Sequence, residues 1–309
     1  MNIMQKKVLS NTVFVIAAGA FGAFFRWLQL QTSFEEETGL IKAGALNYIV
    51  PLVLLCAAFL FYRLVKKEKD GPLAAPLTIA DTFRGTGFVY ALAFYAAAVL
   101  TAVGGFVTFL EAGGTAAPGL TLLLGLCAIL CGLSFPAVCK SSRKKYSPKL
   151  VSTLMTFPIV MLAIWLVGSY KANASDPTLW AYAVEIVTIC VVMAAFYYTA
   201  GVAFGRAQPY KAMFAAMLGA FLCISTLADS RIFGEQLMFL GIAVMLLTEN
   251  GVILANMKEP APAEEKPETP AAPAPAPAAE EESVVIKAGE RDITAEPTIT
   301  APDRMSDNK

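Results

Sequence analysis

Eight long apolar segments follow one another along the chain, separated by shorter polar stretches. A helix needs about 20 mostly apolar residues to cross a bilayer, and each segment approaches that length. Backbone amides cannot remain unpaired in lipid, and the alternating pattern of a membrane barrel is absent, so the spans must be helices. The pattern predicts an all-α, polytopic membrane helix bundle. The expected transmembrane helices are residues 9–29, 43–62, 88–110, 119–139, 150–170, 179–203, 212–230 and 237–257.

Prolines and glycines modify several of these segments. Each proline inside a span removes a backbone donor and is expected to kink its helix. Gly201 and Gly205 are four residues apart, a spacing that lets a neighbouring helix approach closely. Contacts within one chain use this spacing as readily as dimers do, so it does not identify an oligomer. The prolines concerned are Pro51, Pro136 and Pro158.

The composition changes abruptly at Lys258. Residues 258–309 begin KEPAPAEEKPETPAAPAPAPAAEEE, which is rich in proline, alanine and glutamate and has no apolar face to bury. Such a segment is too poor in hydrophobic residues to fold alone, so we expect a disordered cytoplasmic tail. The apolar run at residues 283–287 is either a less polar part of this tail or a strand that adds to a partner's sheet.

Charge is divided unevenly along the chain. Residues 258–309 carry 12 acidic and 6 basic side chains, whereas residues 1–257 carry 12 acidic and 18 basic ones. Outside the expected spans of residues 1–257, 14 lysines and arginines fall on one side and three on the other. Because basic loops stay in the cytoplasm, this split places both termini there and requires an even number of spans.

The tryptophans agree with this orientation, because all three then fall at the outer membrane interface, where tryptophan is enriched. They are Trp27, Trp165 and Trp180. The apolar run at residues 13–25 of the first span is too long for a signal peptide and is followed by Arg26 and Trp27 instead of small residues, so we expect an uncleaved helix. The compact loops suit the plasma membrane of a bacterium.

Several functional classes are excluded by residues that the chain lacks. It contains no histidine, which removes Ser-His catalysis and HExxH metal chemistry. No GxxxxGK[ST] or GxGxxG motif follows a strand-like run. The six cysteines lie in or beside apolar spans, where cysteine behaves as a small hydrophobic residue. We therefore expect no catalytic residues, no cofactor and no metal, and the modest charge does not indicate nucleic acid as a partner.

One carboxylate lies deep in a predicted span. Glu249 is about 18 Å from the outer end of the last helix by the helical rise, and no basic residue is expected at that depth. An unpaired carboxylate in hydrocarbon costs at least about 2.5–3.5 kcal/mol, so Glu249 should be protonated, face water, or hold a cation or ligand. Asn250, Ser225 and Thr226 are its expected polar neighbours. The alternative is a purely structural carboxyl, which either hydrogen-bonds to a neighbouring helix or lies close enough to the inner interface to reach water.

Two further charges are predicted at matching depths near the outer ends of their spans. Arg26 lies close to the end of the first helix, and Glu185 lies about 8 Å below the start of the sixth by the helical rise. We expect an Arg26–Glu185 ion pair, whose simplest role is to neutralise two charges inside the bundle.

Two functions remain compatible with the sequence. In the first, the bundle binds or transports a small solute or proton, and Glu249 is the intramembrane ionisable group. In the second, it is a non-catalytic scaffold or signalling component whose residues 258–309 recruit a cytoplasmic protein partner. In both, the constant partner is the lipid bilayer. A polar cavity at Glu249 would favour the first.

Overall fold

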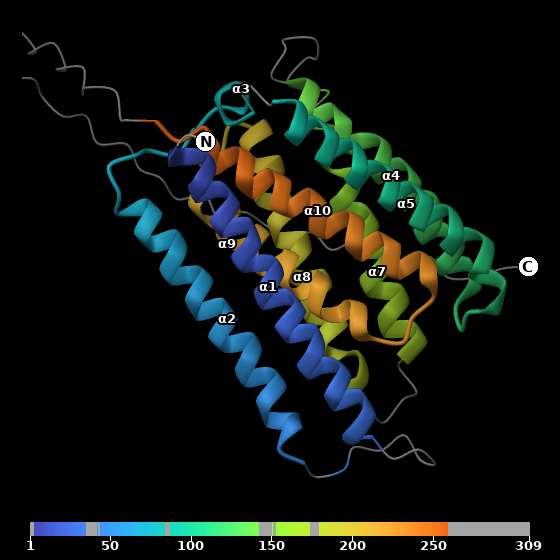
Figure 1. The fold of residues 1–309 in the computed structure, drawn as a ribbon. Coiled ribbons are helices and arrows are strands. Elements are labelled where there is room, and N and C mark those ends of the chain that lie inside the picture. The colour runs from blue at the N-terminus through green and yellow to red at the C-terminus, as the bar shows by residue number, and fades with distance from the viewer. Residues whose placement is uncertain are drawn as a thin grey trace, which may run out of the picture. The chain divides into compact units, whose positions relative to one another are not determined.

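The computed structural model describes residues 3–34, 42, 44–83, 87–141, 150, 153–173 and 179–258. Regular structure in these residues is helical, apart from isolated bridge residues, of which Ala74 and Lys258 pair with each other (Figure 1). The long helices are α1 (Ile3–Thr32), α2 (Leu46–Lys69), α4 (Phe88–Glu111), α5 (Pro118–Ser141), α7 (Phe157–Asn173), α8 (Leu179–Ala203), α9 (Pro209–Ser225) and α10 (Phe233–Ala255). Shorter elements are α3 (Ile79–Thr82) and two 3₁₀ turns, Ala112–Gly114 and Thr226–Ala228. The predicted tail beyond Lys258 lies outside the described residues.

Seven of the described helices are long and apolar enough to cross a membrane. The remaining expected span, residues 150–170, corresponds to α7, which is apolar but has only 17 residues. At about 1.5 Å per residue α7 is roughly 26 Å long, which is near the lower limit for a span. The predicted class, an all-α multi-pass membrane bundle, is confirmed. Cytoplasmic termini and an even number of crossings stay predictions.

Pro158 and Gly205, which were expected inside or beside spans, lie at the ends of helices. Pro158 is the second residue of α7, where a missing backbone N–H costs no helical hydrogen bond, so the kink expected there is wrong. Gly205 follows α8 with φ of 74°, a left-handed conformation that favours glycine. The amide of Arg206 donates to the Gly201 carbonyl at 2.7 Å. Gly201 and Gly205 therefore belong to the cap that ends α8.

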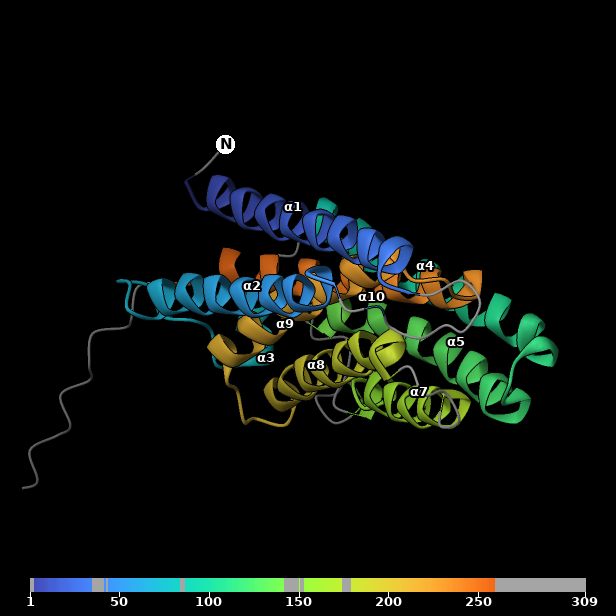
Figure 2. The same cartoon turned by 90° about the horizontal axis from the view of Figure 1, so that it is seen from below.

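Helices α9 and α10 form the centre of the bundle, and most of their residues are buried. Helix α10 packs against α1, α4 and α9, while α9 also packs against α1, α2 and α8. Figure 1 shows α10 between α1 on one side and α4 with α5 on the other, and Figure 2 shows α7 and α8 side by side beyond α9. The outward faces of α1, α2 and α4 expose large apolar side chains, as lipid-facing helices do.

The bundle has two ends, which are called the Asp229 end and the Lys258 end. The turns at residues 112–117 and 226–232 lie at the Asp229 end, and residues 70–78, 204–208 and 256–258 lie at the Lys258 end. At the Lys258 end, the amides of Ala74 and Lys258 donate to each other's carbonyls at 2.7 and 3.1 Å, and Asn256 Nδ2 donates to the Thr82 carbonyl at 2.8 Å. The predicted orientation would put the Asp229 end outside the cell.

Small residues let α4 lie close against α10. A Cβ atom added at Gly241 would be 2.4 Å from Thr101 Oγ1 and 2.8 Å from the Thr101 backbone nitrogen, and one at Gly104 would be 2.7 Å from the Gly234 carbonyl oxygen. Backbone atoms cannot move aside without moving the helix, so these glycines set the separation of α4 and α10.

We expect Gly241→Ala to destabilise the bundle by about 2 kcal/mol, because overpacking outweighs the better helix propensity of alanine. The measurement is the unfolding free energy of the purified full chain in detergent titrated with SDS. Gly168→Ala in α7 is the matched control, because its added Cβ would meet only Leu120 Cβ at 3.9 Å. Equal stability of the two variants would contradict close α4–α10 packing.

Candidate functional site

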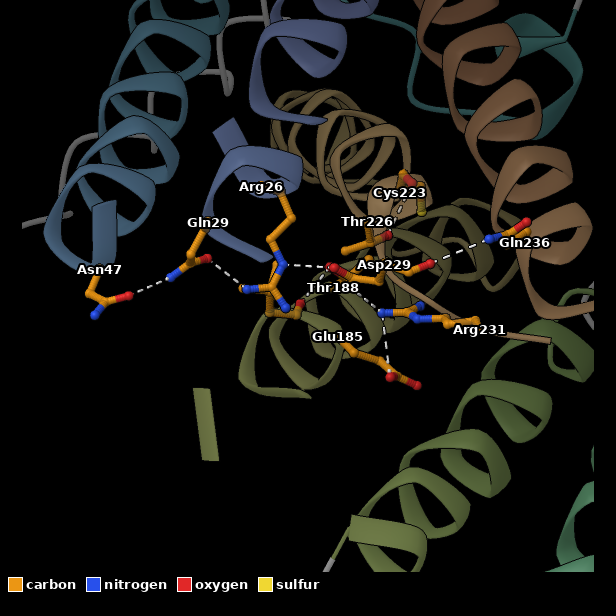
Figure 3. Close-up of polar contacts among 11 residues, drawn as sticks. Arg26, Gln29, Asn47, Glu185, Thr188, Cys223, Thr226, Asp229, Arg231 and Gln236 are labelled. Carbon is orange, nitrogen blue, oxygen red and sulfur yellow. Dashed lines mark hydrogen bonds and ion pairs between the residues drawn. The ribbon is translucent and has the colours of Figure 1, made fainter. Parts of the chain in front are cut away.

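A cluster of buried charges lies at the Asp229 end (Figure 3). Arg26 of α1 donates from Nε to Asp229 Oδ1 at 2.7 Å, and Arg231 donates from Nη2 to Asp229 Oδ2 at 2.7 Å. The same Nη2 lies 3.4 Å from Glu185 Oε2 of α8. One carboxylate therefore joins two guanidinium groups, and through it α1, α8 and the α9–α10 turn are held together.

The α9–α10 turn places Asp229 and Arg231 by its own hydrogen bonds. The Thr226 hydroxyl donates to the Cys223 carbonyl at 3.0 Å, the Asp229 amide donates to the Thr226 carbonyl at 3.1 Å, and Gln236 Nε2 donates to the Asp229 carbonyl at 3.3 Å. Asp229 itself has extended backbone, with φ of −72° and ψ of 145°. In extended backbone, residues two apart point to the same side, which directs both charged side chains into the bundle.

Arg26 is further tied to α1 and α2. Its Nη1 donates to Gln29 Oε1 at 2.8 Å, and Gln29 Nε2 donates to Asn47 Oδ1 at 3.3 Å. The arginine side chain is only 2% exposed. Buried charges are tolerated when they are paired and hydrogen-bonded, which fits a structural role for Arg26.

A pocket of about 220 Å³ lies beside Arg231 and Glu185, between α5, α7, α8 and the start of α10. Trp165 Nε1 donates to Glu185 Oε1 at 3.2 Å. The Trp165 and Phe239 ring centroids are 4.3 Å apart, and the Arg231 guanidinium lies 4.8 Å from the Phe239 centroid. These contacts fix the orientation of the charged groups. The polar side chains that line the pocket are those of Thr115, Thr121, Ser169, Asn173, Glu185, Ser230, Arg231 and Glu235.

Two buried polar atoms from residues that line this pocket have no hydrogen-bond partner among the described residues. They are Nη1 of Arg231 and Oγ of Ser169. An unpaired buried donor costs about 1–3 kcal/mol, and more when it is charged. A solute with matching acceptors would remove that cost. No group of three or more Cys, Asp or Glu residues in the described part of the chain is placed to hold a metal ion.

The structure brings the two members of the predicted ion pair into one network. Arg26 bonds to Asp229, and Glu185 lies against Arg231, so Asp229 and Arg231 connect them. Sequence reasoning missed both connecting residues, because Asp229 falls at the end of the expected span 212–230 and Arg231 directly after it, where charges are usually solvated. The signal that could have found them is an acid and a base two residues apart at the end of a span.

The tryptophans differ in their surroundings. Trp165, expected at the outer membrane interface, is only 2% exposed because it packs inside the pocket wall. Trp27, near the end of α1, is half exposed. Trp180 lies at the start of α8, and its side chain falls outside the described part of the structure.

The second predicted site, Glu249 with Asn250, lies toward the Lys258 end of α10. Both side chains are buried, and Thr199 of α8 donates its hydroxyl to Glu249 Oε1. Glu249 Oε2 and Asn250 Oδ1 have no hydrogen-bond partner among the described residues. Thr199 was not foreseen, because the sequence does not show which helix faces Glu249.

Ser225 and Thr226, predicted as neighbours of Glu249, lie instead at the Asp229 end. Antiparallel helices joined by a short turn place the end of α9 beside the start of α10, and Glu249 is sixteen residues beyond that start. The helical rise makes this a separation of roughly 24 Å. The Ser225 hydroxyl bonds to the Phe221 carbonyl at 2.9 Å, and the Thr226 hydroxyl serves the turn described above. The four residues predicted as one polar site therefore lie in two places, with Ser225 and Thr226 at the Asp229 end and Glu249 and Asn250 toward the Lys258 end.

No protein-family model matches the chain, and neither a curated protein nor a solved structure matches it. Function is therefore inferred from the chemistry of the two buried polar sites.

Proposed function

We propose that this multi-pass membrane protein binds a small polar solute in the pocket at the Asp229 end and transports it across the membrane. The observation that carries the proposal is the pair of unpaired buried atoms, Arg231 Nη1 and Ser169 Oγ, on residues that line this pocket. A bundle built only for stability has no need of a charged donor held without an acceptor.

The size and charge of the pocket indicate the class of solute. Its volume of about 220 Å³ is below the roughly 300–1,000 Å³ of pockets that hold drug-sized ligands, so it suits a small metabolite. Arg231 Nη1 can donate to a carboxylate, whereas Glu185 and Glu235 can accept from an ammonium group. A guanidinium and two carboxylates in one pocket favour an amino-acid-like zwitterion.

Glu249 would supply the coupling group of such a transporter. It lies on α10, the helix whose first turn carries Glu235 of the pocket. A buried carboxyl with one oxygen that lacks a described partner is suited to take up a proton or cation during transport. The two sites would then be linked by movement of one helix.

A thermal-shift screen of the detergent-purified full chain tests the proposal, with the common amino acids, dicarboxylates and diamines as probes. We expect at least one amino acid to raise Tm, since a solute at about 100 times its Kd stabilises by about 2.7 kcal/mol. Ser169→Ala and Glu235→Gln should each reduce that shift. Ser134→Ala should retain it, because Ser134 does not line the pocket and its hydroxyl donates within α5, to the Cys131 carbonyl at 2.7 Å. A screen without any shift, or a shift that both pocket variants retain, would contradict a solute site.

The alternative, a membrane scaffold whose residues 258–309 recruit a cytoplasmic partner, has one supporting observation. Backbone pairing of Lys258 with Ala74 fixes the point at which the tail leaves the bundle, beside the basic end of α2. A partner bound to the tail would then be tethered to the Lys258 end of the bundle. Solute binding in the screen would favour transport over this alternative.

A further inference from the structure

A second groove lies between α1 and α2 at the Lys258 end, and the proposed transport function does not use it. Its volume is about 840 Å³. The apolar part of its lining includes Phe14 of α1 with Phe59 and Leu60 of α2. The polar part consists of Ser10, Asn11, Arg63, Lys66, Lys67 and Asp70.

The groove continues toward the middle of the bundle as an apolar slot of about 310 Å³. Phe14 and Leu60 line both spaces, so the two adjoin along α1 and α2. Beyond them the slot is lined by Ala18, Phe21, Leu52, Cys56 and Phe221, among others. Along α1 and α2, the surface therefore passes from cationic at the helix ends to purely apolar inside the span.

The charged part of the groove lining carries a net positive charge. Arg63, Lys66 and Lys67 face a single acidic lining residue, Asp70. The neighbouring Glu68 is paired with Lys7 of α1 and does not neutralise the groove. The guanidinium of Arg63 lies 5.8 Å from the Phe59 ring centroid, a cation–π arrangement that leaves its N–H groups available at the groove edge.

We propose that this groove binds one anionic phospholipid of the leaflet at the Lys258 end. The phosphate lies against Arg63, Lys66 and Lys67, and one acyl chain fills the slot between α1 and α2. Clusters of Lys and Arg beside a transmembrane helix attract anionic headgroups. A soluble anion would use the basic residues alone, whereas an apolar slot that opens from the same groove requires a ligand with both a charged head and a hydrocarbon chain.

Native mass spectrometry of the full chain tests the site, with equimolar phosphatidylcholine and phosphatidylglycerol added to the delipidated protein. We expect a retained phosphatidylglycerol adduct in preference to phosphatidylcholine. Replacing Arg63, Lys66 and Lys67 together with glutamine should reduce that adduct about tenfold or more. The combined variant Arg143→Gln, Lys144→Gln and Lys145→Gln removes the same charge from another basic segment and should retain the lipid.

Two further measurements distinguish a bound lipid from a bound free anion. Cys56→Phe leaves every charge in place and fills the slot, so it should also reduce the adduct. Inorganic phosphate in excess should not displace the lipid. Equal retention of the two lipids, or equal losses in the two charge variants, would overturn the site. Displacement by inorganic phosphate together with an unaffected Cys56→Phe variant would overturn the lipid assignment.

Discussion

Replacing Asp229 with alanine should destabilise the bundle by about 3–5 kcal/mol, the largest loss of stability expected from a single substitution in this chain. The Asp229 carboxylate lies 2.7 Å from a nitrogen of Arg26 and 2.7 Å from a nitrogen of Arg231, and all three side chains are at most 7% exposed. Removing it leaves two buried cations without their shared anion. The measurement is the unfolding free energy of the purified full chain in detergent titrated with SDS.

An exposed ion pair provides the control for this substitution. Asp81 Oδ1 lies 3.5 Å from Lys258 Nζ, and the two side chains are 44% and 56% exposed. Exposed pairs contribute about 1 kcal/mol or less, and the hydrogen bond that Asp81 Oδ2 accepts from Thr78 Oγ1 at 2.8 Å is also exposed, so Asp81→Ala should have a small effect. If the Asp229 and Asp81 variants lost the same stability, the Asp229 cluster would be solvated and its structural role would be contradicted.

The membrane environment explains why so much of the fold could be predicted. Long apolar segments have few alternatives to helix in lipid, and therefore seven expected spans correspond to long apolar helices. Helix ends were less predictable. Pro158 and Gly205 look like interruptions of a span in the sequence, and only the backbone geometry shows that one begins α7 and the other follows the end of α8.

The candidate sites were predictable only where a charge interrupts an apolar run. Arg26, Glu185 and Glu249 have that signal, and all three lie in the polar sites of the structure. Asp229 and Arg231 lack it, because charges in a turn are usually solvated and burial there depends on which helices surround the turn. Ser169 also lacks it, since a serine in a transmembrane helix is ordinary until its hydroxyl is found without a partner among the described residues.

The two polar sites are separated along α10, so under the proposed function solute binding depends on the pocket and solute transport depends on Glu249 as well. The pocket at the Asp229 end contains the groups suited to hold a zwitterion, whereas Glu249 lies roughly 21 Å beyond the pocket residue Glu235 by the helical rise, with Thr199 as its described donor. A solute held at the pocket does not touch Glu249. Under the proposed function, a change at Glu249 should therefore affect movement of the solute without affecting its binding.

We expect Glu249→Gln to reduce solute uptake about tenfold or more, because glutamine accepts the Thr199 hydrogen bond but cannot take up or release a proton. The measurement is uptake into proteoliposomes of the radiolabelled amino acid that gives the largest thermal shift. The same variant should retain that thermal shift and unfold within about 1 kcal/mol of the unmodified chain, since the buried acceptor is preserved.

Thr248→Val is the matched control for Glu249→Gln. Thr248 precedes Glu249 on α10, and its hydroxyl donates within the helix, to the Val244 carbonyl at 2.6 Å. Both variants should bind the solute, and only Glu249→Gln should fail to transport it. Undiminished uptake by Glu249→Gln would show that the carboxyl is a structural acceptor for Thr199, and coupling would have to depend on groups at the Asp229 end.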